Sequence, residues 1–206
     1  MNFGIKDKKR ILIAFFAVIG MGISVSFLLR VNMGTDPYTC MNTGAAAKLG
    51  LTFGSWQALL NFFLLGIVFV CDRKQIGWGT IFNMLLVGYM ADFFTWLSDL
   101  VLTENLFYHV SVRWFVMIPA LVLFVLAASL YMSAGLGAAP YDALIFIVAD
   151  HIPGVPLRIV RIFLDGIGCV IGYLLGSTVG VVTILIALAL GPVVQWMKEK
   201  MDCLLI

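Results

Sequence analysis

Charged side chains are scarce in this sequence. Only 12% of the 206 residues are Asp, Glu, Lys or Arg, while 62% are hydrophobic. Soluble domains carry roughly 25% charged residues, so this chain has too few to cover a surface that faces water. No basic run with interleaved aromatic residues is present, so we expect no nucleic-acid partner. Composition therefore predicts an integral membrane protein whose first partner is the lipid bilayer.

Metal-binding and catalytic patterns are also missing. The four cysteines are scattered without a C-x-x-C spacing, and the two histidines lie in connecting segments with no carboxylate beside them in a ligand pattern. The chain has no nucleophile and base in a recognisable arrangement, and no phosphate-binding loop. We therefore expect no metal, no cofactor and no enzymatic activity.

The sequence contains several long apolar runs. They lack the alternation of barrel strands, and the backbone must satisfy its own hydrogen bonds in lipid, so we expect helices. The first run continues for about 20 residues after the basic N-terminus, which favours a retained span over a cleaved signal. The six predicted spans are 11–30, 56–71, 78–97, 114–134, 157–176 and 178–197.

The distribution of Lys and Arg orients these spans. Basic residues gather before the first span, between the second and third, and after the sixth: Lys6, Lys8, Lys9, Arg10, Arg73, Lys74, Lys198 and Lys200. Six spans place all three groups on one side, which the positive-inside rule makes cytoplasmic. The predicted organisation is a cytoplasmic segment 1–10, a three-helix repeat 11–98, an extracytoplasmic connector 99–113, a second three-helix repeat 114–197 and a cytoplasmic tail 198–206.

A Gly-x-x-Pro-Tyr motif occurs twice, in "NMGTDPYTCM" after the first span and in "GLGAAPYDAL" after the fourth. The copies are 103 positions apart, and the same offset aligns further residues without a gap, among them Ser26 with Ser129, Gly77 with Gly180 and Thr80 with Thr183. Each half holds three spans, an odd number, so the second half must enter the membrane from the opposite side. We therefore predict an all-α polytopic membrane protein with six transmembrane helices arranged as two inverted three-helix repeats.

Two segments, Pro37 to Leu49 and Pro140 to Ile152, are too short to span the bilayer. Each is predicted to form a short helix with proline in its first turn, either interfacial or re-entrant. Gly34 and Gly137 permit backbone geometry that other residues avoid, and Pro37 and Pro140 interrupt a continuing helix, so these four positions are candidate hinges. Inverted repeats would place the two motif copies on opposite faces of the membrane.

The first motif, followed later by "IGWGTIFNMLLVG", resembles the YczE/YyaS/YitT family of bacterial integral membrane proteins. The resemblance covers nearly the whole chain. It implies a location in the bacterial inner (plasma) membrane, and it implies no particular substrate.

Ionisable residues inside apolar runs are the first candidates for a substrate site, because placing one at the bilayer centre costs on the order of 3 kcal/mol. Asp165 lies near the middle of the fifth span, and Arg161, one turn earlier, can pair with it. The pair is either linked to substrate or protons, or a structural ion pair. Asp92 and its repeat mate Gln195 lie at matching inverted depths, either along one path or in contact with interfacial water.

The short helices supply further candidates. A helix N-terminus suits an anionic group, but Asp142 occupies the second N-terminus, and Asp36 is a candidate N-cap of the first. Tyr38 and Tyr141 are candidate hydrogen-bond donors facing a pore, or interface anchors. The structural alternative for both motifs is a capped turn from loop to helix.

Glycine also recurs every four residues at Gly168, Gly172, Gly176 and Gly180. Such a stripe lets helices approach closely, within one bundle or across a homodimer.

Together these features predict a transporter (permease) of an unidentified small solute, working by alternating access. Because the chain has no nucleotide-binding motif, transport would be driven by a gradient or by a separate partner. The alternative is a non-transporting accessory or scaffold subunit of a partner complex.

Overall fold

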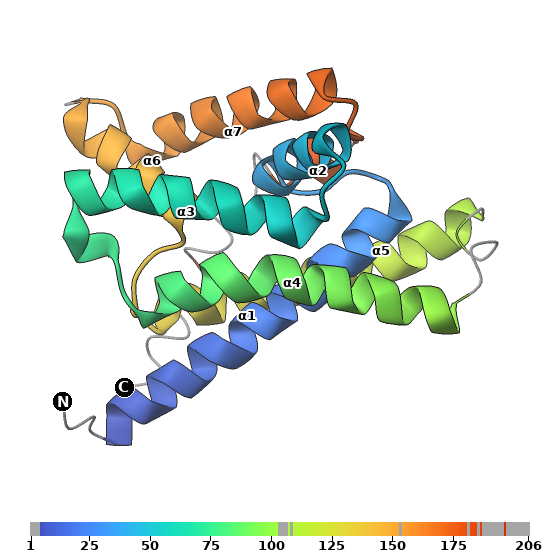
Figure 1. Ribbon diagram of the computed structural model, residues 1–206, viewed down its shortest axis with the longest axis horizontal. Helices are drawn as coiled ribbons and strands as arrows, with labels where there is room; N and C mark the ends of the chain where they lie inside the picture. The colour runs from blue at the N-terminus through green and yellow to red at the C-terminus, as the bar shows by residue number, and fades with distance from the viewer. Residues whose placement is uncertain are drawn as a thin grey trace.

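The computed structural model describes residues 5–102, 107, 109–152, 154–180, 182–184, 186 and 196. Over this part of the chain the regular secondary structure is entirely helical, as predicted (Figure 1). The elements are α1 (Ile5–Val31), α2 (Pro37–Leu49), α3 (Phe53–Cys71), the 3₁₀ helix η1 (Arg73–Gln75), α4 (Trp78–Val101), α5 (Val110–Ser133), α6 (Pro140–His151) and α7 (Leu157–Leu174).

Four of these helices are long and apolar enough to cross a membrane: α1 from Lys8, α3, α4 and α5. The helix α7 corresponds to the predicted fifth span but carries three charged residues, Arg158, Arg161 and Asp165. Most of the predicted sixth span, 178–197, lies outside the described residues. The six-span arrangement is thus seen in part.

The helices extend beyond several predicted boundaries. The helix α1 begins at Ile5, inside the segment expected to precede the first span, and α4 continues to Val101 while α5 begins at Val110. The end of α4 and the start of α5 therefore lie within the segment 99–113, the predicted connector. The reason is that a helix continues past its apolar run wherever its backbone hydrogen bonds can still form. At the end of α4, Arg30 of α1 pairs with Asp99 and so ties the last turn to the bundle.

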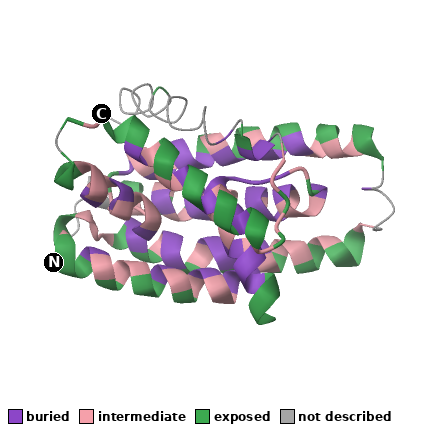
Figure 2. Ribbon diagram, turned by 90° about the horizontal axis from the view of Figure 1, so that it is seen from above, coloured by how far each residue is buried: buried purple, intermediate pink, exposed green. Residues whose placement is uncertain are grey.

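The two helices that open the halves, α1 and α5, lie side by side, below the layer that holds α2, α3, α6 and α7 in the view of Figure 1. Small and branched side chains such as Val25 and Ala127 fill their contact, and the buried serines Ser24 and Ser129 donate to carbonyl oxygens of their own helices. The outward faces carry exposed residues such as Phe62 and Phe115. Figure 2 shows buried positions gathered along the middle of the bundle and exposed ones outside, as lipid-facing helices require.

The short helices pack across the halves. The helix α2 of the first half lies against α7 of the second half, and α6 of the second half lies against α3 of the first. Glycine makes the first contact possible: a Cβ at Gly172 would be 2.7 Å from Cys40 Sγ, and one at Gly168 would be 3.3 Å from the Pro37 carbonyl oxygen.

The rest of the glycine stripe departs from the expectation of continuous packing. Gly176 follows the end of α7 with a φ of +87°, and a Cβ there would meet nothing within 4 Å. Gly176 therefore forms the left-handed turn that follows the helix. It makes no helix–helix contact, because α7 has already ended. Gly180 lies instead against the backbone of Met33, beyond the helix.

The turns that enter α2 and α6 repeat one arrangement. Gly34 has a φ of +100° and lies against Gly180 and Thr183, leaving no room for a Cβ. Gly137 has a φ of +101° and lies in the same way against Gly77 and Thr80. Each motif glycine thus packs on the Gly-x-x-Thr segment of the other half.

Candidate functional site

A cavity of about 100 Å³ lies inside the bundle, and all seven α-helices contribute to its wall. Many lining residues come in pairs separated by the repeat offset of 103 positions. These pairs are Met21 and Phe124, Val25 and Ala128, Asp36 and Ala139, Tyr38 and Tyr141, Thr39 and Asp142, and Asn83 and Ile186. The cavity therefore lies where the two halves meet.

The two Gly-x-x-Pro-Tyr motifs meet at this cavity. The rings of Tyr38 and Tyr141 stack with their centroids 4.5 Å apart and their planes 21° from parallel. The expectation that the motif copies lie on opposite faces is therefore wrong for the motifs themselves. The cause is the extended chain before each proline, which runs from the end of a long helix into the bundle interior, so that α2 and α6 both begin inside (Figure 1). Only their C-terminal ends, with the exposed Lys48 and His151, point away from each other.

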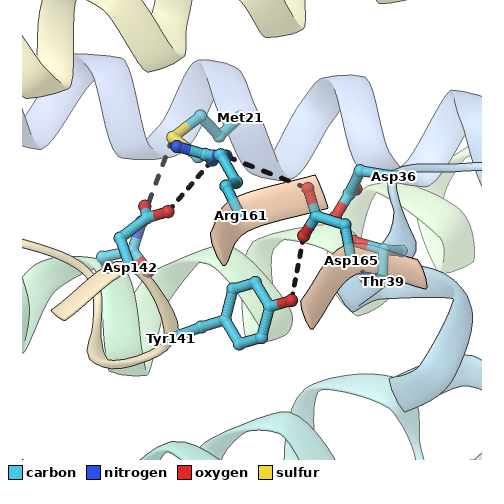
Figure 3. Close-up of polar contacts among 8 residues, drawn as sticks. Met21, Asp36, Thr39, Tyr141, Asp142, Arg161 and Asp165 are labelled. Atoms are coloured by element: carbon cyan, nitrogen blue, oxygen red, sulfur yellow. Dashed lines mark hydrogen bonds and ion pairs between the residues drawn. The ribbon is translucent and has the colours of Figure 1, made fainter. Parts of the chain in front are cut away.

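Arg161 of α7 is the one positively charged side chain among the described residues that line the cavity. Its guanidinium Nη2 donates to Asp142 Oδ1 at 3.0 Å, and its Nε lies 3.9 Å from Asp165 Oδ2 (Figure 3). The predicted pairing of Arg161 with Asp165 one turn later is confirmed, but the shorter contact is to Asp142 on α6. Sequence reasoning missed this second partner because it lies on another helix.

Each stacked tyrosine also ties its short helix to the next helix of its own half. The Tyr38 hydroxyl donates to Asn61 Oδ1 on α3 at 2.6 Å, and the Tyr141 hydroxyl donates to Asp165 Oδ1 on α7 at 2.9 Å. The two contacts occupy neighbouring repeat positions, because Asn61 aligns with the residue just before Asp165. The acceptor is an amide in the first half and a carboxylate in the second, so the cavity is built alike from both halves but charged on one side.

Asp36 is the N-cap of α2, as predicted. Its Oδ2 accepts from the Thr39 backbone N–H at 3.0 Å, and Pro37 fills the first helical position. The equivalent position before α6 is Ala139, which offers no side-chain cap, and Asp142 lies in the first turn instead. Both helix N-termini thus carry a carboxylate that takes the place an anionic ligand would need.

Three amide side chains in the cavity wall were not among the predicted site residues: Gln57, Asn61 and Asn83. All three lie within apolar runs and are more than nine-tenths buried. Gln57 Oε1 and Asn61 Nδ2, and also Asp36 Oδ1, have no hydrogen-bond partner within the described part of the chain. The sequence did carry a signal for these three residues, because an amide inside an apolar helix is energetically unfavourable unless it finds a hydrogen-bond partner.

Two predicted site residues lie elsewhere. Asp92 is absent from the cavity wall, and its Oδ2 accepts from the Gly54 backbone N–H at 2.9 Å, in the first turn of α3. This contact joins α4 to α3 at a helix N-terminus, which is a structural role. Gln195 lies outside the described residues. Among the residues that the structure describes, no group of three or more His, Cys, Asp and Glu side chains is placed to hold a metal ion.

Comparison with known proteins identifies a matching family and several relatives. The model of a "Family of unknown function (DUF6198)" matches residues 8–199. An "Uncharacterized protein" of Haemophilus influenzae is 27% identical over 188 residues, covering 91% of this chain and 83% of the relative. The "Uncharacterized membrane protein YczE" of Bacillus subtilis is 25% identical over 179 residues, covering 87% and 80%. The "Uncharacterized protein YyaS" of the same species is 25% identical and covers 65% of each chain. No solved structure matches the chain.

The similarity to YczE and YyaS that the two motifs predicted is confirmed over most of the chain. The apolar helices and the similarity to a named membrane protein agree that this is a membrane protein. With nearly all of its length matched, the chain belongs to the DUF6198 family, whose function is unknown.

Proposed function

We propose that this protein is a transporter of a small solute in the bacterial inner membrane, working by alternating access between two inverted halves. One observation carries the proposal: a cavity with charged and amide side chains in its wall lies between the halves, and equivalent positions of both halves line it. Transporters built from inverted repeats bind their substrates in this place, where discontinuous helices meet near the middle of the membrane.

The swapped contacts of the motif glycines support the inverted arrangement. Gly34 of the first half packs on Gly180 and Thr183 of the second, and Gly137 of the second packs on Gly77 and Thr80 of the first. A two-fold axis that exchanges the halves produces such reciprocal pairs. With three spans in each half, that axis lies in the membrane plane, so the halves enter from opposite sides.

The re-entrant reading of α2 and α6 follows from the same axis. Both helices begin beside the buried cavity and end at exposed residues near opposite ends of the long helices (Figure 1). Irregular backbone at membrane depth is tolerated where it lies within protein or lines a cavity, as the segments before Pro37 and Pro140 do. Each half would then present one helix N-terminus to the solute.

The contacts show what must rearrange if the halves rock. The tyrosine hydroxyls bond within their own halves, Tyr38 to Asn61 and Tyr141 to Asp165, whereas the stacked rings join the halves. The contacts of α2 with α7 and of α6 with α3 also join the halves. In this mechanism the Tyr38–Tyr141 stack and these helix contacts open and re-form together.

Orientation follows from charge. The basic residues Lys8, Lys9 and Arg10 at the start of α1 and Arg73 and Lys74 in η1 lie toward the same end of the bundle (Figure 1). The positive-inside rule makes that end cytoplasmic, so we place both termini in the cytoplasm.

Flux measured in proteoliposomes tests the proposal. The purified protein is reconstituted and a panel of small cationic, anionic and neutral solutes is screened for uptake. Asp165→Asn should abolish uptake while the protein remains folded, because it removes the carboxylate that holds Tyr141 and Arg161. Asp92→Asn is the matched control, since Asp92 lies outside the cavity wall. Absence of flux across the panel, together with a stoichiometric partner in a pull-down, would favour an accessory subunit instead.

A further inference from the structure

The charged side chains that line the cavity are mostly acidic in the part of the chain that the structure describes. There, three carboxylates, those of Asp36, Asp142 and Asp165, face one guanidinium, that of Arg161. Arg161 is engaged by Asp142 and Asp165, whereas Asp36 receives only the backbone N–H of Thr39, on Oδ2. An ionised carboxylate buried in this way is strongly unfavourable unless a positive charge or a proton accompanies it. The described lining therefore favours a cationic ligand over an anionic one.

The unpaired polar atoms indicate which ligand groups the cavity suits. Among the described lining residues these atoms are two acceptors, Asp36 Oδ1 and Gln57 Oε1, and one donor, Asn61 Nδ2. The two acceptor side chains are 8% and 4% exposed. A proton on Asp36 would remove its charge and supply a single O–H donor. An ammonium group supplies a positive charge and several N–H donors in one ligand.

The cavity also limits the size and nature of the rest of the ligand. A cavity of about 150 Å³ holds benzene, so this one, at about 100 Å³, suits roughly four non-hydrogen atoms by the same comparison. Much of its wall is apolar or aromatic, including Val87, Phe124 and the stacked tyrosines. Such a wall suits a short alkyl chain, and aromatic faces also favour a nearby ammonium group.

We propose that the cavity binds a small primary alkylammonium cation, with its charge held by Asp36 and an N–H donated to Gln57. This inference rests on the proposed function in one respect, that the bound cation is taken to be the transported solute. Asp142, Arg161 and Asp165 then form the fixed, internally paired side of the site, and Asp36 is the carboxylate left free for the ligand.

Binding is tested without transport, by thermal unfolding of the purified full-length protein in detergent. Ethylammonium chloride should raise the unfolding temperature in a saturable manner, because a ligand that binds only the folded state stabilises it. Sodium chloride, sodium acetate and acetamide at the same concentrations should leave it unchanged. Equal stabilisation by sodium chloride, acetate or acetamide, or none by ethylammonium, overturns the proposal.

Two variants locate the charge. Asp36→Asn should weaken ethylammonium binding by about tenfold or more, the loss expected for one charge-assisted hydrogen bond. It should still fold, because asparagine caps helices as well as aspartate does. Asp92→Asn changes a carboxylate of α4 that accepts from the start of α3 and lies outside the cavity wall, so this variant should bind like the unchanged protein. Unaltered binding by Asp36→Asn contradicts the assignment.

The outcomes separate the two proposals. Ethylammonium binding without flux of any solute would leave the cation site standing and remove the transporter. Flux of an anionic solute with no ethylammonium binding would keep the transporter and remove the cation site.

Discussion

At the scale of single residues, Arg161 decides how the second half of the cavity is held together. Its side chain is about a quarter exposed, at 23%, and so is that of Asp142, at 22%, while Asp165 is more buried at 9%. Water screens a pair at this depth only in part, so losing one partner costs more than it would at a surface. Arg161 is therefore needed to neutralise Asp142 and Asp165, whichever solute the protein carries.

A double-mutant cycle tests this coupling. Arg161→Gln should destabilise the protein by about 3 kcal/mol, because it leaves two carboxylates without their cation. Asp142→Asn should cost less, since Arg161 keeps its contact with Asp165. The double variant should be more stable than Arg161→Gln alone, because Asp142 is then neutral. Thermal unfolding in detergent measures all four proteins. Strictly additive losses would mean that the two side chains do not interact.

At the scale of secondary-structure elements, α7 has one face that must lie close to α2. Gly168 and Gly172 form that face, against Pro37 and Cys40. The close approach matters for the site because α2 carries Asp36 and Tyr38, and α7 carries Arg161 and Asp165. Separating the two helices would widen the cavity on the side where its charges lie.

Alanine substitutions on α7 test this contact. Gly172→Ala should destabilise the protein by about 1–3 kcal/mol, since the new methyl group would meet the Cys40 sulfur and backbone. Gly166→Ala, on the same helix, is the control: a Cβ there meets nothing within 4 Å, so stability should be unchanged or slightly higher. The midpoints of thermal unfolding compare the two. Equal effects would show that helix propensity, and not the contact with α2, governs the response.

At the scale of the whole molecule, the proposed two-fold relation would make the ends of α2 and α6 equivalent but opposite. Lys48 and His151 are 103 positions apart, and both are exposed at the C-terminal ends of their helices. If the halves are inverted, these two positions lie on different sides of the membrane although the helices begin side by side.

Cysteine labelling in whole cells tests that arrangement, in a background without Cys40, Cys71, Cys169 and Cys203. Lys48→Cys should react with a membrane-impermeant maleimide added outside the inner membrane. His151→Cys should react only after the membrane is permeabilised. Because both positions are exposed, similar total labelling after permeabilisation is the control. Labelling of both from the same side would exclude the inverted arrangement.

The local features of the fold could be predicted from the sequence because they depend on neighbours along the chain. The start of α2 at Pro37 with Asp36 as its cap, and the pairing of Arg161 with Asp165, follow from helix geometry within one or two turns. The membrane class follows from composition. Gln57 and Asn61 could also have been predicted as site residues, because amides within apolar runs need buried partners.

The sequence alone determined that this is a helical membrane protein, that its halves repeat at one offset, and that its charged candidates fall in few places. Only the tertiary structure decided that the two tyrosines stack, that Arg161 takes Asp142 as its nearer partner, and that Asp92 caps a helix outside the cavity. Patterns along the chain indicate where helices run and how they are capped. The contact of Arg161 with Asp142, 19 positions apart, and that of Asp92 with Gly54, 38 positions apart, depend instead on how whole helices pack. The same holds for the two tyrosines, which are a full repeat apart. The site is made from such contacts.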